Sequence, residues 1–500
     1  MLEEEGKMKL HGIKKACVAA AVTTLIVGGF AIPASACTSV FAGKKATADD
    51  SVMVARNEDV SSAWSKHVKV FPRKTHKSGE KLKFVTGLTV DQPKVSYKYI
   101  AIPDWDPSKG PFEEAGINEY GVAISATNSA YANKKAEASD PFVKKGVSES
   151  VIPTLILPRA KTAREGAELL GQYIEKYGSA EANGVAIADK NEIWYFEVGT
   201  GHQWVAERVP DNAYLIVANG LRIDNVNLSD TKNFMGSKTL ISHAVEKGLI
   251  PNNDKDNNQK FDFAGTYGDI GQKYNTRREW WGQKTFTPSI NQDAELTRYP
   301  LFMIPDQKIT PKQVMKFLGS HYEGTSYDPS TSTGKDERAV GVDRTVESHV
   351  IQLRSNMPAD IANVMWLSLA NPEYSVYLPF YQGIYDTPTA FKHGNDKYDD
   401  QSAYWAFRAP AALAATNPDT LGVGLKNYWG KYEDQLFTKQ SSVENKASEL
   451  YKEDKQKAIK YLNKYSNDTA TDAFIKAKQL RNELITDIAK KSKDVFNPDL

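Results

Sequence analysis

An apolar segment that ends against a cysteine constrains this chain more than any other feature of its sequence. The segment ACVAAAVTTLIVGGFAIP follows a lysine-containing stretch, and Ala34-Ser35-Ala36 separates it from Cys37. A basic start, an apolar middle and small residues before the cleavage site are typical of a secretory signal peptide. A membrane anchor has a similar apolar length, but Gly28-Gly29 and Pro33 interrupt this run. We therefore predict that residues 1–36 are a signal peptide, removed by signal peptidase, and that the protein is secreted or held at the cell surface.

The distribution of cysteines adds a second constraint. Cys17 lies inside the predicted signal peptide, which leaves Cys37 as the one cysteine of residues 37–500. No disulfide can therefore form within the mature chain, although export would bring it into an oxidising environment. A lone thiol outside the cell is a liability, so we expect an exposed Cys37 that is kept for its chemistry. Cleavage before Cys37 would leave a thiol and a free α-amine on one residue.

Charge and length exclude some classes of partner. The full chain of 500 residues has 63 basic and 62 acidic residues, and removal of residues 1–36 leaves 59 of each, because four lysines and three glutamates go with them. A mature chain without net charge gives no electrostatic reason to bind nucleic acid or an anionic membrane. Its length is sufficient for a large hydrophobic core.

Local patterns predict strands and helices in separate blocks. Residues 38–60 form two apolar stretches separated by Asp49-Asp50, which predicts two strands and a turn. Apolar runs separated by turn residues predict further strands within 183–219 and within 348–381. Apolar residues at helical spacing, followed by a glycine, predict a helix over 163–177. Such blocks favour an α+β fold with a mainly antiparallel sheet.

The character of the sequence changes near residue 400. Ala473, Ala477 and Leu480 begin a series at helical spacing within a background rich in lysine, aspartate and glutamate. We predict that residues 431–500 form long amphipathic helices, packed on the core or on a partner. Residues 37–430 would then be the main domain.

The new N-terminus would carry its own catalytic pair. The thiolate is the reactive form of cysteine, whose ordinary pKa is about 8.5. An α-amine has a pKa of about 8, so the amine of Cys37 could accept the thiol proton near neutral pH without any histidine. A cation beside the sulfur would favour the thiolate, and an anion would hold the amine. Arg56 and Asp59, at the end of the neighbouring predicted strand, are the candidates for these two roles.

The first stretch after the predicted cleavage site resembles a known family. CTSVFAGKKATADDSVMVARNED is similar to the opening of the PepD-like dipeptidases, which are cysteine members of the N-terminal-nucleophile (Ntn) hydrolases. More distantly it resembles penicillin V acylases and bile salt hydrolases, which share a cysteine followed by Arg-Asn-x-Asp. The resemblance continues through NEYGVAISATNS, FDFAGTYGD, YNTRREWWGQK, RTVESHVIQL and VMWLSLANPEYSVYLPFYQGI, so it extends from residue 37 to about residue 385.

The resemblance implies a fold and an activity. The fold would be a four-layer αββα Ntn-hydrolase sandwich, with residues 37–430 as the catalytic domain and residues 431–500 as a helical extension. The activity would be hydrolysis of amide bonds in small peptides, above all dipeptides, with no metal and no organic cofactor. The relatives and the helical C-terminus also leave a homo-oligomer open.

The resemblance also assigns residues. Cys37 matches the N-terminal nucleophile, and Arg56 and Asp59 match its immediate partners. Asn128 and Asn219 occupy the positions where the acylases place asparagines near the oxyanion. Arg277, in YNTRREWW, aligns with a further active-site arginine, with Arg278 directly beside it.

Two alternatives stay open at this point. An N-acyl amide hydrolase of the penicillin V acylase or bile salt hydrolase type would use the same chemistry on another substrate. A lipid-anchored binding protein would carry a lipid on Cys37, although lipoprotein signals usually have an aliphatic residue where this chain has Ala34. The sequence leaves undecided the preferred substrate side chains, attachment to the cell wall, and whether signal peptidase or self-cleavage exposes Cys37.

Overall fold

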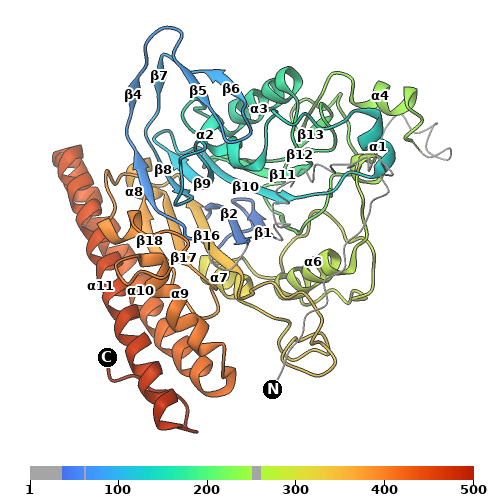
Figure 1. The fold of residues 1–500 in the computed structure, drawn as a ribbon. Helices are drawn as coiled ribbons and strands as arrows, with labels where there is room; N and C mark the ends of the chain where they lie inside the picture. The colour runs from blue at the N-terminus through green and yellow to red at the C-terminus, as the bar shows by residue number, and fades with distance from the viewer. Residues whose placement is uncertain (1–36, 61–63, 251–260) are drawn as a thin grey trace, which may run out of the picture. The chain divides into compact units, whose positions relative to one another are not determined.

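Two antiparallel β-sheets carry most strands in the computed structural model, which describes residues 37–60, 64–250 and 261–500 (Figure 1). The predicted signal peptide lies outside the described residues, as do the side chains of residues 126–128. One sheet has six strands, in the order β14 (Tyr214–Val217), β1 (Thr38–Ala42), β2 (Val52–Asp59), β16 (Thr345–Leu353), β17 (Val364–Leu369) and β18 (Leu378–Tyr381).

The second sheet has eight strands and lies next to β2 through its strands β10 and β11. Its order is β15 (Phe234–Gly236), β13 (Trp204–Arg208), β12 (Ile193–Val198), β11 (Asn183–Ala188), β10 (Ala123–Ser129), β9 (Glu113–Asn118), β8 (Tyr99–Pro103) and β3 (Lys69–Phe71). There are also two two-stranded sheets, β4 (Lys74–Thr75) with β7 (Val95–Ser96) and β5 (Lys81–Lys83) with β6 (Thr89–Asp91). The predicted strand blocks and their antiparallel pairing are confirmed.

Strand β2 differs from an ordinary core strand in its second half. All eight of its residues are buried, and Val52, Met53 and Val54 supply the apolar contacts that anchor it between β1 and β16. The buried residues that follow are polar or charged from Arg56 to Asp59. Burying four such side chains in a row is costly unless each finds a partner, so this strand end marks a built polar site.

The helix predicted over 163–177 is confirmed as α3 (Ala163–Tyr177). The side chain of Thr162 accepts a hydrogen bond from the backbone N–H of Glu165, which caps the first turn. Gly178 ends the helix with φ at +73°, a conformation that favours glycine. The apolar stripe of α3 packs on β11 and β12, together with α2 (Ile152–Ile156) and the 3-10 turn η1 (Glu149–Val151) nearby.

The remaining helices lie elsewhere along the chain. They are α1 (Lys134–Ser139), α4 (Leu240–Glu246), α5 (Phe263–Tyr267), α6 (Lys273–Phe286), α7 (Pro311–Leu318), α8 (Ala359–Ala362), η3 (Thr389–Lys392), α9 (Ala403–Ala414), η4 (Pro418–Gly422), α10 (Val423–Glu453) and α11 (Lys455–Lys490). Figure 1 shows α9, α10 and α11 together beside β17 and β18, and contacts join α9 to β17 and α11 to β18.

The C-terminal helices are confirmed, and they pack on the six-stranded sheet. Helix α10 begins at Val423 and runs unbroken to Glu453, so the predicted boundary at residue 430 falls inside it. Asp454 separates α10 from α11 and caps α11 through its carboxylate, which accepts from the N–H of Gln456. The division into domains stays a prediction, whereas the α+β class with antiparallel sheets and C-terminal helices is observed.

The described part of the chain has neither a membrane-spanning helix nor a metal-binding cluster. None of its helices combines the length and the apolar character needed to cross a membrane. Likewise, the described residues include no group of three or more histidine, cysteine, aspartate or glutamate side chains arranged to hold a metal ion.

Candidate active site

Cys37 lies immediately before β1 of the six-stranded sheet. The β1–β2 register pairs Thr38 with Asn57 and Ser39 with Arg56, so this hairpin brings Arg56 beside Cys37. The sulfur forms no disulfide, and Cys37 is 0% exposed in the 500-residue chain. That burial is of the chain that still carries residues 1–36, so exposure of the thiol after their removal stays a prediction. In this uncut chain the nitrogen of Cys37 is a peptide nitrogen.

Arg56 connects the sulfur to two carboxylates. Its Nη2 donates to the Sγ of Cys37 at 2.9 Å and to the Oε1 of Glu149 at 2.7 Å. Its Nη1 donates to the Oε2 of Glu114, on β9, at 2.6 Å. Burial alone would lower the pKa of Arg56, but the negative charges of the Cys37 thiolate, Glu114 and Glu149 outweigh it and raise that pKa. A permanently charged guanidinium at the sulfur favours the thiolate form.

A second buried cation continues this network. The Nζ of Lys66 lies 2.6 Å from Glu58 and 3.9 Å from Glu114, and it also pairs with Asp104. Burial and the charge of Glu114 raise the pKa of Glu58 well above its ordinary range, although Lys66 opposes that shift. Carboxylates from β2 and β9 therefore meet at two buried cations, Lys66 and Arg56.

Asp59 is held at the end of β2. It is fully buried, pairs with Arg338 and accepts a hydrogen bond from the hydroxyl of Thr345, on β16. These contacts hold its carboxylate at the strand end, and the nitrogen of Cys37 bears no free amine in this chain. The predicted contact between Asp59 and that amine stays a prediction.

Asn219 meets Cys37 through an arginine of α6. The Nη1 of Arg278 donates to the backbone oxygen of Cys37 at 2.6 Å and to the hydroxyl of Thr38 at 2.9 Å. Its Nη2 donates to the Oδ1 atoms of Asn219 and Asn275, each at 2.8 Å. Burial and the positive charge of Arg338 lower the pKa of Arg278 to about 10, so it stays protonated at neutral pH.

Arg277, the predicted arginine, does not join this cluster. Its Nη2 pairs with Glu295 at 2.7 Å, and its guanidinium lies 3.5 Å from the ring centroid of Tyr327. Adjacent helical residues point about 100° apart, so one of two neighbouring arginines reaches Cys37 and the other does not. The spacing of Asn275 and Arg278 at i and i+3 is the sequence signal that identifies the inward face.

The other predicted asparagine is described only in part. The backbone of Asn128 pairs with Gly184 of β11, after a register shift between Ser125 and Asn128. Bulges of this kind redirect side chains and are frequent next to active sites. The side chain of Asn128 lies outside what the structure describes. Of the residues around Cys37, Glu114 and Glu149 were missed by the sequence analysis, because they belong to no recognisable motif.

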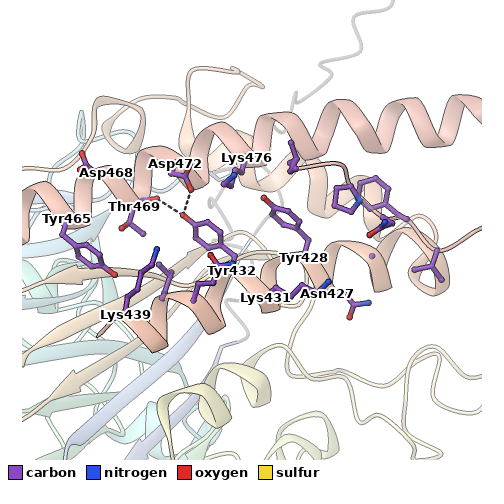
Figure 2. Close-up of a pocket in the computed structure, with 18 residues that line it drawn as sticks. Asn427, Tyr428, Lys431, Tyr432, Lys439, Tyr465, Asp468, Thr469, Asp472 and Lys476 are labelled. Atoms are coloured by element: carbon purple, nitrogen blue, oxygen red, sulfur yellow. Dashed lines mark hydrogen bonds between the residues drawn. The ribbon is translucent and has the colours of Figure 1, made fainter. Parts of the chain in front are cut away.

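A cavity of about 750 Å³ lies far along the chain from these residues, between α10, α11 and the C-terminal tail (Figure 2). Tyrosines, lysines and acids line it, and the hydroxyl of Tyr432 donates to Asp472 at 2.8 Å. None of its lining residues belongs to the cluster around Cys37. A much smaller cavity, of about 20 Å³, is lined by Gly220 and Asn275, next to Asn219. Size alone therefore does not identify the reactive centre.

Comparison with known proteins assigns the family. The model of Peptidase family C69 matches residues 36–430, which is most of the chain. The chain belongs to Peptidase family C69. This C69 peptidase is 33% identical over 479 residues to a protein of Latilactobacillus sakei named "Probable dipeptidase", covering 94% of this chain and 98% of that one. It is 39% identical over 390 residues to a "Probable dipeptidase" of Salmonella dublin, covering 77% of this chain and 87% of that one.

The predicted resemblance to the dipeptidase family is thus confirmed. A solved structure of a mutant conjugated bile acid hydrolase from Clostridium perfringens also matches the C69 peptidase, with 11% identity and a TM-score of 0.34. That match covers 69% of this chain and 92% of the other. A likeness at this level carries no argument about fold or activity.

Proposed function

We propose that this C69 peptidase is an exported dipeptidase that uses Cys37 as an N-terminal nucleophile. The observation that supports this most is the 2.9 Å hydrogen bond from Arg56 to the sulfur of Cys37 in a chain whose relatives are named dipeptidases. A buried arginine held by Glu114 and Glu149 has no need of a sulfur for its own pairing. Its contact with the sulfur is useful if the sulfur reacts as a thiolate.

The proposed reaction uses the groups of Cys37, the peptide substrate and one water molecule. After removal of residues 1–36, the α-amine of Cys37 takes the proton of its own thiol. The Sγ then forms a bond to the carbonyl carbon of the peptide, and the resulting ammonium protonates the departing amine as the C–N bond breaks. Water next attacks the thioester, gives up a proton to the α-amine, and releases the first amino acid with return of the proton to the sulfur.

Stabilisation of the oxyanion is assigned to asparagine side chains. Arg278 donates to the Oδ1 of Asn219, which orients the Nδ2 end of that amide as a donor. Asn128 is proposed as a second donor on the strength of the family resemblance. Donors positioned before the reaction stabilise the developing negative charge without reorganisation. Each typically lowers the activation free energy of a hydrolase by about 3 kcal/mol.

The finer fold assignment belongs to the same proposal. Helices α2 and α3 contact the eight-stranded sheet, β2 contacts β10 and β11, and α7, α9 and α11 contact the six-stranded sheet. These contacts support an αββα arrangement of four layers, as expected for an Ntn hydrolase. Export through the signal at residues 1–36 is part of the proposal, because an N-terminal cysteine requires their removal.

A substrate panel and an intact mass test this function together. Protein recovered from an exporting host should have the mass of residues 37–500 without a lipid, and it should hydrolyse unmodified dipeptides. Penicillin V and conjugated bile salts serve as the comparison substrates. Hydrolysis of those amides alone would overturn the dipeptidase assignment, and a thioether lipid on Cys37 would overturn the mechanism.

A further inference from the structure

Glu149 occupies a position relative to the sulfur that the reaction as described so far does not use. One nitrogen, the Nη2 of Arg56, donates to Sγ at 2.9 Å and to the Oε1 of Glu149 at 2.7 Å. Because both contacts share this nitrogen, the Oε1 of Glu149 lies no farther from Sγ than the sum of the two distances. Glu149 begins the 3-10 turn η1, which contacts β9 and β10. Its carboxylate is therefore fixed beside the reacting atoms by a strand-supported turn.

This separation matches the dimensions of a dipeptide. In a peptide with a free N-terminus the α-nitrogen lies about 2.5 Å from the first carbonyl carbon. A nucleophile in position to attack lies about 3–3.5 Å from that same carbon. A carboxylate that shares one arginine nitrogen with the sulfur can therefore contact the substrate ammonium while Sγ faces the carbonyl carbon.

Access distinguishes Glu149 from the other carboxylate on Arg56. The side chain of Glu114 is 2% exposed and lies near both Arg56 and Lys66. The side chain of Glu149 is 12% exposed, whereas Arg56 is closed off completely. Of the two carboxylates on Arg56, that of Glu149 is therefore the more accessible to solvent.

The cluster contains fewer cations than carboxylates. Arg56 and Lys66 are the cations that pair within it, and its carboxylates are those of Glu58, Asp104, Glu114, Glu149 and Glu181. Glu181 accepts a hydrogen bond from the backbone N–H of Glu149 at 2.7 Å. Burial and the charge of Glu114 raise the pKa of Glu181. Glu149 shares Arg56 with Glu114, so its carboxylate would attract a second positive charge placed beside it.

A buried amide next to Glu149 gives a second and independent indication. Asn183 is 1% exposed, and neither atom of its side-chain amide has a hydrogen-bond partner within the part of the chain that the structure describes. Asn183 pairs with Ser129 across β10 and β11, so the two side chains lie on the same face about 5 Å apart. The hydroxyl of Ser129 donates to Glu149 at 3.2 Å. An amide without hydrogen-bond partners beside a carboxylate suits a ligand with several N–H donors.

We propose that Glu149 binds the α-ammonium of the substrate and so makes a free N-terminus a requirement for cleavage. The ligand class is a primary ammonium one carbon away from the scissile carbonyl. This inference rests on the proposed dipeptidase function and deepens it, because it names the residue that separates dipeptides from N-acyl amides. Glu149 then acts twice, on Arg56 through one oxygen and on the substrate.

A pair of substrates that differ only in the ammonium tests the assignment. Alanyl dipeptides and their propionyl analogues have the same scissile bond, and the analogues lack the α-amine. The mature wild-type enzyme should prefer the dipeptide in kcat/KM by about 100-fold, the usual loss when a buried charge loses its partner. In Glu149→Gln the dipeptide should lose most of that advantage, with the two substrates ending within about threefold of each other.

Glu114→Gln is the matched control, since it also removes a carboxylate from Arg56 but lies deeper. It should lower kcat/KM on both substrates by a similar factor and so keep the ratio of the two values. This is the result expected of a residue that only positions Arg56. Equal losses on both substrates in Glu149→Gln would overturn the inference. Glu149→Asp retains the charge and should retain most of the preference. If Glu149→Gln fails to fold, Glu149→Ala replaces it, and equal losses of kcat/KM on both substrates would again overturn the inference.

Failure of the proposed function has a different outcome. A wild-type enzyme that cleaves neither substrate contradicts the dipeptidase assignment itself. A wild-type enzyme that cleaves the dipeptide and the propionyl analogue equally well leaves the dipeptidase assignment in place and excludes Glu149 as the ammonium site.

Discussion

Two buried arginines in this molecule have opposite surroundings. Arg354 follows β16 and pairs with Glu444 of α10 through both carboxylate oxygens, at 2.9 and 2.6 Å, while its Nε donates to the backbone oxygen of Ala362. Arg56 bonds two different carboxylates and a sulfur, and its Nε has no hydrogen-bond partner among the described residues. Arg354 thus pairs with a single carboxylate, whereas Arg56 divides its donors between two carboxylates and a sulfur.

Under the proposed function, the difference separates a structural site from a reactive one. A bidentate pair in which each of the three side-chain nitrogens of Arg354 has a partner connects the C-terminal helices to the sheet. Around Arg56 charge and hydrogen bonding are left unbalanced, which costs stability and is found where a protein performs chemistry. Burial of an ion pair is therefore not a sign of function by itself. What distinguishes Arg56 is its contact with a sulfur and an Nε that has no hydrogen-bond partner among the described residues.

The largest expected effect is on the reactive side of this comparison. Cys37→Ala, measured on protein that lacks residues 1–36, should lower kcat/KM on dipeptides by about 10⁴-fold or more, because no other group forms the thioester. The free energy of unfolding should change by only about 1–2 kcal/mol. Activity assays and urea denaturation measure the two quantities. Turnover comparable to that of wild type would exclude Cys37 as the nucleophile.

The next effect is on the structural side. Glu444→Ala removes the partner of Arg354 and also the acceptor for the hydroxyl of Tyr381. Since the positive charge of Arg354 would be left buried, the free energy of unfolding should fall by about 3–5 kcal/mol, with kcat/KM per folded molecule unchanged. Glu449→Ala, at an exposed pair with Lys446 on the same helix, is the control and should leave the denaturation midpoint unchanged. A loss of activity without a loss of stability in Glu444→Ala would remove the distinction between the two arginines.

The smallest expected effect is a dependence of stability on pH, caused by Glu433 on the structural side of the comparison. Glu433 of α10 accepts from the backbone N–H of Tyr377, and burial raises its pKa from 4.5 to about 7, although that hydrogen bond and Lys312 oppose the shift while Asp434 adds to it. The folded protein thus holds this proton more tightly than the unfolded chain, so stability falls as the pH rises from about 4.5 to about 7.

Glu433→Gln removes this dependence while keeping an acceptor for Tyr377. Relative to wild type it should gain up to about 3 kcal/mol in the free energy of unfolding between acidic and mildly alkaline pH. Urea denaturation of both proteins across that range measures the gain, and kcat/KM should be the same for both. A difference between the two proteins that stays constant with pH would contradict the raised pKa.

Local sequence patterns predicted the parts of the site that are close together along the chain. Cys37 and Arg56 are joined by one hairpin, so alternating apolar residues and a turn were sufficient to place them side by side. The same reasoning predicted α3, whose apolar stripe and flanking cap lie within one short stretch. The limits of α10 were harder to predict, because its first residues are apolar and continue the preceding core segment.

Residues from distant elements could not be placed in this way. Glu114 and Glu149 come from a strand and a turn whose local sequences carry no chemical signature, and they meet Arg56 only because the two sheets pack together. The choice between Arg277 and Arg278 depended on which face of α6 lies toward the start of β1. That face follows from helix packing, since Gly282 on it approaches Ile216 of β14 closely.

The amino-acid sequence by itself determined that a cysteine follows an apolar segment, that an arginine lies one predicted strand away, and to which family the chain belongs, because these depend on residue identity and short-range order. Tertiary structure alone decided how many carboxylates surround that arginine, which of them remains accessible, and which neighbouring arginine meets the cysteine. The physical reason is that electrostatic interactions act through space, so the charge around a buried group depends on elements that the fold brings together from distant parts of the chain.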